Sequence, residues 1–457
     1  MLHDTALYRA LLFLAAVIAL LVATQRRRVH PFVAILLAAV AFAYLAGMRT
    51  AIIARQFGIG FSTMIYVPGL VIVAARLIAG LADSSGASDR LLALIAGRRW
   101  LRPHWIASSL GLIAGLGASP SASFALLSPL LRPVGGKTPA GRESAAVALA
   151  LSLSAGHGLA VLSPVGIAAV SILGADWRRV VLLAAPIAIG LTVFAALFSR
   201  RLPAVGAEPS LERESGTDSR PVPAKYGGSA VMLVLASLIP LLMEMARSLA
   251  DIPSEPLGGE PGLEVIVAMG APLVLLLVGV GLATIGAARL SFSLLADSTW
   301  METILAKVSA LLLTVCAAGA LQAICQQSGM AEALAERVLN WHLVPVVGLL
   351  LPLLAAATMK TLQGSSLVAA ITAAGMVQPL LAPLGLADAN GKALAALAVG
   401  IGATTICHLN DEYFWLVSSS AGFSPLRGVA TISFGTLLQG LLAAVMLLLA
   451  SSLVPNF

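Results

Sequence analysis

Long apolar runs, separated by short polar stretches, alternate along almost the whole chain. Each run has about 20 residues, the length that an α-helix needs to cross the ~30 Å hydrocarbon core of a bilayer. This pattern predicts an all-α polytopic membrane protein with about 10–12 spans. The continuous runs lie at residues 7–24, 30–47, 60–80, 143–172, 179–198, 227–247, 263–286, 302–325, 392–418 and 428–453.

Two more apolar segments, residues 104–132 and 343–378, are interrupted by glycine, proline, serine or lysine. Backbone that leaves the helix at membrane depth is tolerated only where it is buried in protein or lines a wet cavity. We therefore expect these segments to be re-entrant hairpins or pairs of short helices inside the bundle.

The two halves of the chain show weak internal similarity. Residues 75–96 and 318–339 both read as the end of a span, a polar Ser-Gly corner and an amphipathic helix. In each half an interrupted segment follows, and then a broken span with a histidine, which is His157 or His408. Since the matching spans run in opposite directions, we predict two inverted repeats, with a transport site near the bilayer midplane.

These patterns divide the chain into five predicted parts. The polar linker is rich in proline, serine, glutamate and arginine, a composition typical of a solvated cytoplasmic connector. The parts are N-terminal spans at 1–59, a first inverted repeat at 60–199, the linker at 200–226, connecting spans at 227–301 and a second inverted repeat at 302–457.

The composition strengthens the membrane interpretation. Of the 457 residues, 59% are hydrophobic and 11% are charged, whereas a soluble domain carries about 25% charged residues. The net charge of +7 comes from basic residues that cluster in loops next to the spans. Such clusters set the orientation of a protein in the membrane, so no nucleic-acid partner is predicted.

The first apolar run is expected to be a retained span. The basic triplet Arg26–Arg28 follows this run instead of preceding it, and no small-residue cleavage site is evident, which disfavours a cleaved signal peptide. Because basic loops face the cytoplasm, we expect a multi-pass protein of the bacterial inner membrane with its N-terminus in the periplasm.

A polar cluster interrupts the apolar run at 394–417. The cluster consists of His408, Asn410, Asp411 and Glu412. Ionisable groups at membrane depth are costly and usually serve a function, so Asp411 is the candidate for proton uptake and release, with His408 as a second coupling residue. A simpler interpretation is that Asp411 caps a half-helix. We expect Glu412 to point to another helix face, toward the cytoplasmic end.

The second interrupted segment carries a cation at its break. The polar residues there are Lys360, Gln363, Gly364 and Ser365. A helix that restarts after a break presents free N–H groups that favour an anion, and Lys360 adds a full positive charge. We predict a carboxylate-binding tip, with Asn410 as a further substrate contact. The alternative is that Lys360 extends to the membrane surface.

The first interrupted segment offers hydroxyl groups but no charge. Ser121 and Ser123 are candidate substrate contacts, as is His157 in the broken span that follows. The alternatives are that the small residues serve close helix packing and that His157 is a buried packing group.

No cofactor and no metal site are predicted. His408 and Glu412 share a helix face at a spacing of four residues, but a zinc site needs three or four protein ligands, and the sequence shows no third. Cys316, Cys325 and Cys407 lie in or beside apolar runs without metal-binding spacing, which indicates buried thiols.

Five pieces of the sequence carry a resemblance to a known family. They are HPFVAILLAAVAFAYLAGM at 30–48, GFSTMIYVPGLVIVAARLIAGLADSSGASDRL at 60–91, SILGAD at 171–176, LQGSSLVAAITAAG at 362–375 and CHLNDEYFW at 407–415. Through them the chain resembles the gluconate permease family, the gluconate:proton symporters and their relatives. The resemblance implies two inverted repeats, re-entrant hairpins and a mobile transport part, often in a homodimer.

The chain departs from the family pattern where a substrate would bind. Lys360 stands where the family typically has arginine. The family typically reads Ser-His-Val-Asn-Asp-Ser-Gly-Phe-Trp where this chain has Cys407 through Trp415, so Glu412 replaces a serine. The first hairpin lacks the family's aromatic residues and aspartate, and its proline-rich element is reduced to Ser163–Gly166. These differences leave the identity of the substrate open.

Together these features predict a permease, not an enzyme, that moves a small organic anion such as gluconate or another sugar acid or hydroxy acid by proton symport. Two alternatives stay open. One is a sodium-coupled carboxylate transporter of the same superfamily. The other is a membrane-embedded enzyme that uses His157, His408 and Asp411.

Overall fold

The computed structural model describes residues 5–95, 102–117, 119–136, 138–160, 162–202, 229–250, 261–287, 295–339 and 348–453. Almost all of the predicted linker at 200–226 lies outside these ranges. The described residues form helices and turns, without a strand. The prediction of an all-α protein is therefore confirmed.

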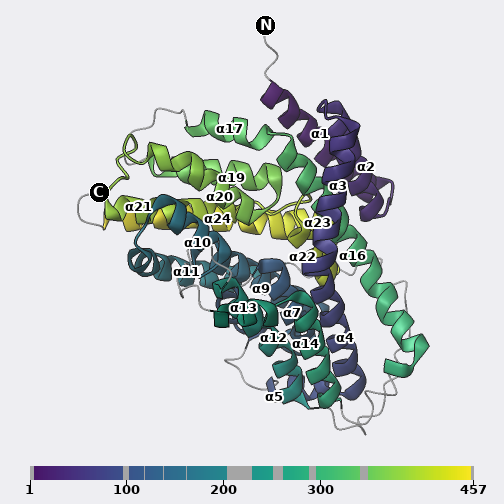
Figure 1. The fold of residues 1–457 in the computed structure, drawn as a ribbon. Helices are drawn as coiled ribbons and strands as arrows, with labels where there is room; N and C mark the ends of the chain where they lie inside the picture. The colour runs from purple at the N-terminus through teal and green to yellow at the C-terminus, as the bar shows by residue number, and fades with distance from the viewer. Residues whose placement is uncertain are drawn as a thin grey trace.

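The first half of the chain folds into helices of very different lengths (Figure 1). They are α1 (Thr5–Arg26), α2 (Pro31–Leu45), α3 (Thr50–Met64), η1 (Ile65–Gly69), α4 (Leu70–Ser85), α5 (Ala87–Ile95), α6 (Pro103–Gly115), α7 (Pro120–Leu127), η2 (Ser128–Leu130), α8 (Leu131–Gly135), α9 (Pro139–Leu159), α10 (Pro164–Leu173) and α11 (Trp177–Arg200).

The second half of the chain also folds into helices of very different lengths. Its helices are α12 (Ala230–Ala250), α13 (Pro261–Met269), α14 (Pro272–Gly286), α16 (Ser298–Gln327), α17 (Met330–Leu339), α19 (Leu350–Gln363), α20 (Ser366–Val377), η4 (Gln378–Leu380), α21 (Ala389–Ala403), α22 (Glu412–Ala421), α23 (Pro425–Gly428), η5 (Val429–Ser433) and α24 (Phe434–Ser452). An inverted relation between the halves stays a prediction.

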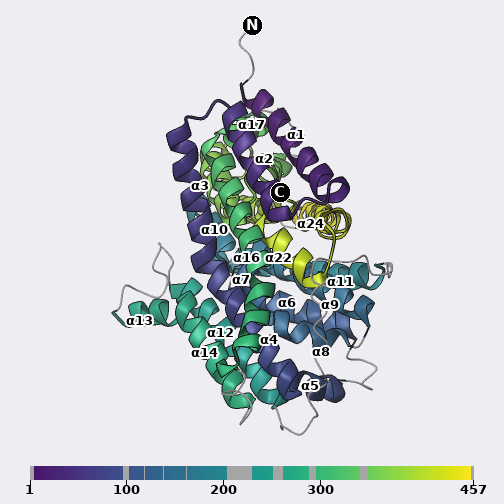
Figure 2. The same ribbon diagram turned by 90° about the vertical axis from the view of Figure 1, so that its right-hand side faces the viewer.

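A long column of helices runs through the molecule. α3 continues through the π-helical turn η1 into α4, and the turn contains Pro68, which lacks the N–H of a regular helical hydrogen bond. α16 packs beside this column, as both views show (Figures 1 and 2). The two helices touch at Gly60 and Gly319, where a Cβ on either residue would overlap the other helix. Small residues at the crossing therefore allow the close contact.

The long apolar helices are suited to a lipid environment. Among the described residues, six helices are long and apolar enough to cross a membrane, or up to eight if two bent pairs each count as one span. Several large side chains on outer helices are well exposed, such as Leu182 at 75%, Leu277 at 61% and Leu449 at 61%. In a soluble protein such surfaces would be a liability, whereas lipid accommodates them.

Some predicted spans are short or broken. The run at 30–47 yields the 15-residue helix α2. The run at 392–418 is interrupted by a non-helical stretch from 404 to 411, between α21 and α22. The break begins after a glycine-rich helix end, and α22 restarts at a capping aspartate. The run at 30–47 thus forms one unbroken helix that is shorter than expected, and the broken span predicted around His408 is confirmed.

Four helix pairs are broken at sites where a serine or aspartate caps the restarting helix. The caps are Ser119 for α7, Ser163 for α10, Ser365 for α20 and Asp411 for α22, and each side chain accepts a hydrogen bond from a backbone N–H of the first turn. Such caps satisfy N–H groups that a helix start leaves free. The interruptions predicted within 104–132 and 343–378 are thus confirmed.

Helices α9 and α21, each of which ends at a break, cross near their C-terminal ends. The contact is made by Gly158 and Gly400, and a Cβ on Gly400 would overlap the carbonyl oxygen of Gly158. At this crossing the backbones of the two helices touch, and the side chain of Thr404 also lies against Gly158. The crossing brings the ends of both helices to the region where the candidate residues lie.

Candidate functional site

Lys360 lies inside the protein near the end of α19. Only 4% of the surface of Lys360 is exposed, so its side chain does not extend to the membrane surface. Its ammonium forms an ion pair with Asp411 and donates to the carbonyl oxygen of Gly364 at 2.5 Å. α19 ends because Gly364 adopts a left-handed φ of +81°, and a Cβ at this position would lie 2.5 Å from the carbonyl oxygen of Asn410. Glycine here lets the hairpin tip and the loop touch.

Asp411 both caps α22 and pairs with Lys360. Its Oδ1 accepts a hydrogen bond from the backbone N–H of Tyr413 at 2.9 Å, and its Oδ2 faces the ammonium of Lys360. The side chains of both partners are at most 5% exposed. The capping interpretation of Asp411 is therefore confirmed, and the ion pair is an additional feature of the same side chain.

Glu412 points into the same region, and the expectation that it faces away is wrong. Its Oε1 accepts from the hydroxyl of Ser121 at 3.1 Å, and its Oε2 accepts from the side-chain amide of Gln322. Ser121 belongs to α7 and Gln322 to α16, so Glu412 joins the tip of the first hairpin to the second half. The break before α22 places Glu412 at a helix start, which turns its side chain differently from that of a residue inside a continuous span.

His408 and Asn410 hold the loop against the end of α19. The Nε2 of His408 lies 2.7 Å from the carbonyl oxygen of Thr361, and the Nδ2 of Asn410 donates to the same oxygen at 3.0 Å. This carbonyl is among those that a helix end leaves without an intrahelical partner. Both side chains thus fix the loop, which in turn fixes Asp411 beside Lys360.

Gln363 links the hairpin tip to α17. Its Nε2 donates to Oε1 of Glu332 at 2.7 Å. Within the described part of the protein, three buried acceptor atoms here receive no hydrogen bond: Oε1 of Gln363, Oδ1 of Asn410 and Oε2 of Glu332. Buried acceptors are normally satisfied, so these three atoms are the ones to which a ligand or a water molecule could donate.

Three further candidates form local hydrogen bonds. The hydroxyl of Ser123 is 3.5 Å from the carbonyl oxygen of Ala114 at the end of α6. His157 is buried in α9, and its carbonyl oxygen accepts from the hydroxyl of Ser163 at 2.5 Å. Ser365 caps α20 next to the tip. Their roles as substrate contacts stay predictions.

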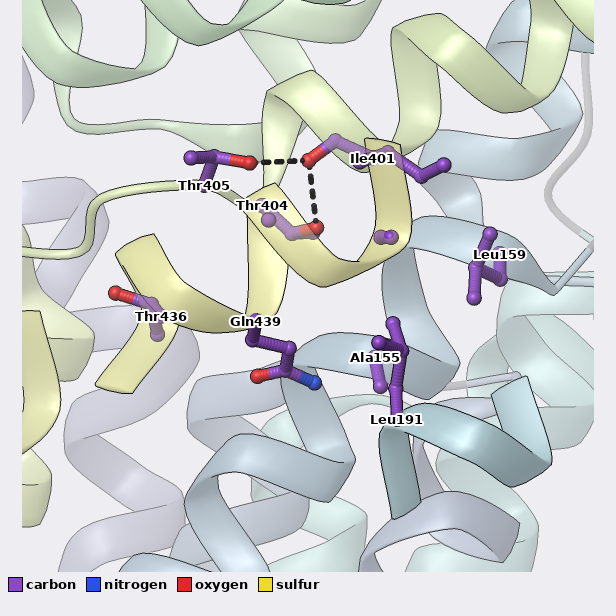
Figure 3. A pocket seen from close by; sticks show the side chains of 10 residues that line it. Ala155, Leu159, Leu191, Ile401, Thr404, Thr405, Thr436 and Gln439 are labelled. Carbon is purple, nitrogen blue, oxygen red and sulfur yellow. Dashed lines mark hydrogen bonds between the residues drawn. The ribbon is translucent and has the colours of Figure 1, made fainter. Parts of the chain in front are cut away.

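A small pocket of about 10 Å³ lies just beyond the end of α21 (Figure 3). The hydroxyls of Thr404 and Thr405 line it and donate to the carbonyl oxygen of Ile401 at 3.1 Å and 2.8 Å. Gln439 lines it from α24, and its Oε1 receives no hydrogen bond within the described residues. This volume suits one water or one small ion. A carboxylate substrate needs more room than this pocket offers.

The described residues contain no group of three or more histidine, cysteine, aspartate or glutamate side chains arranged to hold an ion. The three cysteines are buried and free, as the sequence indicates. The residues that the sequence did not identify are Gln322, Glu332 and the inward side chain of Glu412. The first two are polar positions in the corner at 318–339 that the repeat had already marked, and this was the available signal.

Comparison with known proteins gives a consistent set of relatives. The family described as GntP family permease matches residues 8–454. A gluconate permease of Pseudomonas aeruginosa is 29% identical over 423 residues, 91% of each chain. A D-serine transporter of Escherichia coli strain K12 is 26% identical over 90% of each chain. A high-affinity gluconate transporter of the same strain is 27% identical over 88% of this chain and 89% of that one.

Likeness to solved structures is weaker. The YdaH transporter of Alcanivorax borkumensis aligns over 93% of this chain and 97% of that one, with a TM-score of 0.34 and 17% identity. This likeness is too slight to support a conclusion about the fold.

Proposed function

This chain belongs to the GntP permease family, and from that premise we propose that it is a secondary transporter that carries a small organic anion across a bacterial inner membrane together with protons. Its relatives are named permeases and transporters, so the enzyme alternative is set aside. Gluconate and D-serine, named for relatives, share one carboxylate and at least one hydroxyl. We propose a cargo with the same two groups.

The buried Lys360–Asp411 pair is the observation that supports this proposal most. An ammonium has three donors, and two of those of Lys360 bind Asp411 and the carbonyl oxygen of Gly364. The remaining donor suits a carboxylate, and the start of α20 beside it favours an anion through its N–H groups. Hydroxyls on the cargo would bind the free acceptors of Gln363 and Asn410.

The same pair suggests how protons are coupled to cargo. A cargo carboxylate that takes a place at Lys360 competes with Asp411 for the ammonium. A buried carboxylate that loses its cation is costly unless it is neutralised, and a proton supplies that neutralisation. Cargo and proton would therefore enter together, and both would leave when Asp411 pairs with Lys360 again.

Transport by purified protein in proteoliposomes tests this coupling. We expect an imposed pH gradient to drive uptake of radiolabelled gluconate by the natural protein. Asp411→Asn keeps a capping oxygen for α22 but cannot carry the proton, so gradient-driven uptake should be abolished while exchange of internal for external gluconate persists. Uptake with unchanged pH dependence in Asp411→Asn would overturn the assignment of Asp411.

Sodium coupling is the second candidate, and the small pocket beyond α21 favours it. Thr404, Thr405 and Thr436 supply hydroxyl oxygens and Gln439 supplies a free amide oxygen, all of which are ligand types that hard cations accept. A sodium gradient imposed at equal pH on both sides separates the two candidates. Uptake driven by sodium alone, and retained in Asp411→Asn, would favour this pocket as the coupling site.

A further inference from the structure

The charges around the hairpin tip do not balance. Lys360 is paired with Asp411, Glu412 follows Asp411 directly in the chain, and Glu332 accepts a hydrogen bond from Gln363 at the same tip. Within this set of described residues, one cation thus faces three carboxylates. A cargo that carries only negative charge would add a fourth carboxylate, and like charges repel strongly where the dielectric constant is low.

The partners of Glu412 bind its carboxylate without neutralising it. Ser121 and Gln322 are both neutral donors. An ionised carboxylate offers about four lone-pair sites, so these two bonds leave acceptor capacity on both oxygens. The residue is half-buried rather than sealed. Glu412 can therefore accept a further, charged donor.

Three buried oxygen atoms in the site could accept hydrogen bonds from a ligand. Oδ1 of Asn410, Oε1 of Gln363 and Oε2 of Glu332 receive no hydrogen bond in the described part of the chain, and Asn410 and Gln363 are at most 1% exposed. Asn410 lies in the same loop as Asp411 and Glu412. A ligand rich in N–H and O–H groups would satisfy these acceptors, whereas a second carboxylate would not.

We propose that the cargo is a zwitterion, whose carboxylate binds at Lys360 and whose protonated amine binds Glu412. This inference rests on the proposed function and narrows its cargo from small hydroxylated carboxylates to those that also carry an ammonium group. Glu412 is then the residue that sets specificity, since an ammonium adds the attraction between two full charges to the hydrogen bond that a hydroxyl could donate to the same carboxylate. The family pattern has serine at this position, so the preference would be a property of this chain.

Matched pairs of compounds test the proposal. Gluconate and 2-amino-2-deoxygluconate differ only by a hydroxyl or an ammonium at C2, and glycerate and serine differ in the same way. Uptake of each into proteoliposomes, and competition by each against the other, gives the preference for the amino member. We expect the natural protein to prefer the amino member of both pairs.

Three variants distinguish a role of Glu412 in substrate preference from a general loss of folding or transport. Glu412→Gln keeps the size and hydrogen-bonding capacity of the side chain but removes the charge, so the preference should fall by about 100-fold. Glu412→Asp keeps the charge and should keep the preference, with slower uptake. Glu302→Gln makes the same chemical change at an exposed position of α16 and should behave as the natural protein does.

The possible results point in different directions. Loss of the preference in Glu412→Gln, with its retention in Glu412→Asp and Glu302→Gln, supports the proposal. Equal uptake of both members, preference for the hydroxy member, or an unchanged preference in Glu412→Gln overturns it and leaves the proposed function standing. Failure of the natural protein to bind or carry any of the four compounds overturns the proposed function, and the inference falls with it.

Discussion

At the scale of single residues, the buried Lys360–Asp411 pair is the most consequential feature. Removing two charges from water is expensive, and their attraction offsets that cost only when the remaining groups are also hydrogen-bonded. Both conditions hold here, because Asp411 accepts from Tyr413 and Lys360 donates to Gly364. Loss of one partner would leave the other buried and unpaired.

A double-mutant cycle measures the contribution of this pair to stability. Lys360→Met leaves Asp411 without its cation and should lower the free energy of unfolding by about 3–5 kcal/mol. Adding Asp411→Asn removes the stranded charge while keeping a capping oxygen, so the double variant should be more stable than Lys360→Met alone. Unfolding titrations in detergent provide the values. Losses that simply add would show that the pair makes no net contribution.

The sequence alone identified the two residues of this pair, but neither their contact with each other nor the residues around them. Polar residues in apolar runs are conspicuous, so Lys360 and Asp411 could be identified one by one. Their pairing depends on the fold of a loop that no local pattern specifies. Glu412 was misplaced because a continuous helix would turn it away from Asp411. Gln322 reaches the site from α16, and only tertiary packing reveals such a neighbour.

At the scale of elements, breaks in helices were predictable and crossings were not. Glycine, proline and serine act on the local backbone, so their clusters near residues 119 and 364 marked the two hairpin breaks correctly. The crossing of α9 and α21 depends instead on two glycines far apart in sequence, Gly158 and Gly400. Nothing in either local sequence distinguishes these glycines from others in the chain.

Gly400→Ala should lower the free energy of unfolding because it disturbs this crossing. The added Cβ would overlap the carbonyl oxygen of Gly158, and forced overpacking typically costs about 1–3 kcal/mol. Gly375→Ala is a matched control, because Gly375 lies in α20 with no atom within 4 Å of an added Cβ, and alanine there should stabilise by up to about 1 kcal/mol. Unfolding titrations of both variants check the prediction. Equal stability of the two variants would contradict the tight crossing.

At the scale of the whole molecule, the composition predicted a membrane protein, and the structure shows which apolar runs form continuous helices and which form broken ones. Few charges and many apolar runs indicate a membrane protein without reference to any particular contact. Among the described residues, six to eight helices or bent pairs are long and apolar enough to span a membrane, and apolar runs such as 392–418 fold as two helices with a break between them. Hydrophobicity measures whether a segment can enter a membrane, but it does not tell a spanning helix from two half-helices.

Cysteine labelling in cells tests the predicted orientation. Arg27 and Arg49 are exposed residues at opposite ends of α2, and basic loops should face the cytoplasm. A membrane-impermeant maleimide should label Arg49→Cys in intact cells and Arg27→Cys only after permeabilisation. The native cysteines are buried, so background labelling should be low. The opposite pattern would reverse the assigned topology.

The glycine crossing also bears on how the protein could move. Most packed helices interlock through ridges and grooves of side chains, which resist rotation and sliding. Gly158 and Gly400 present no side chains of their own at their contact, and the side chain of Thr404, at the end of α21, lies against Gly158. Because close-packed contacts transmit strain, a displacement of one helix at this point is passed on to the other. The ends of α9 and α21 are therefore mechanically linked.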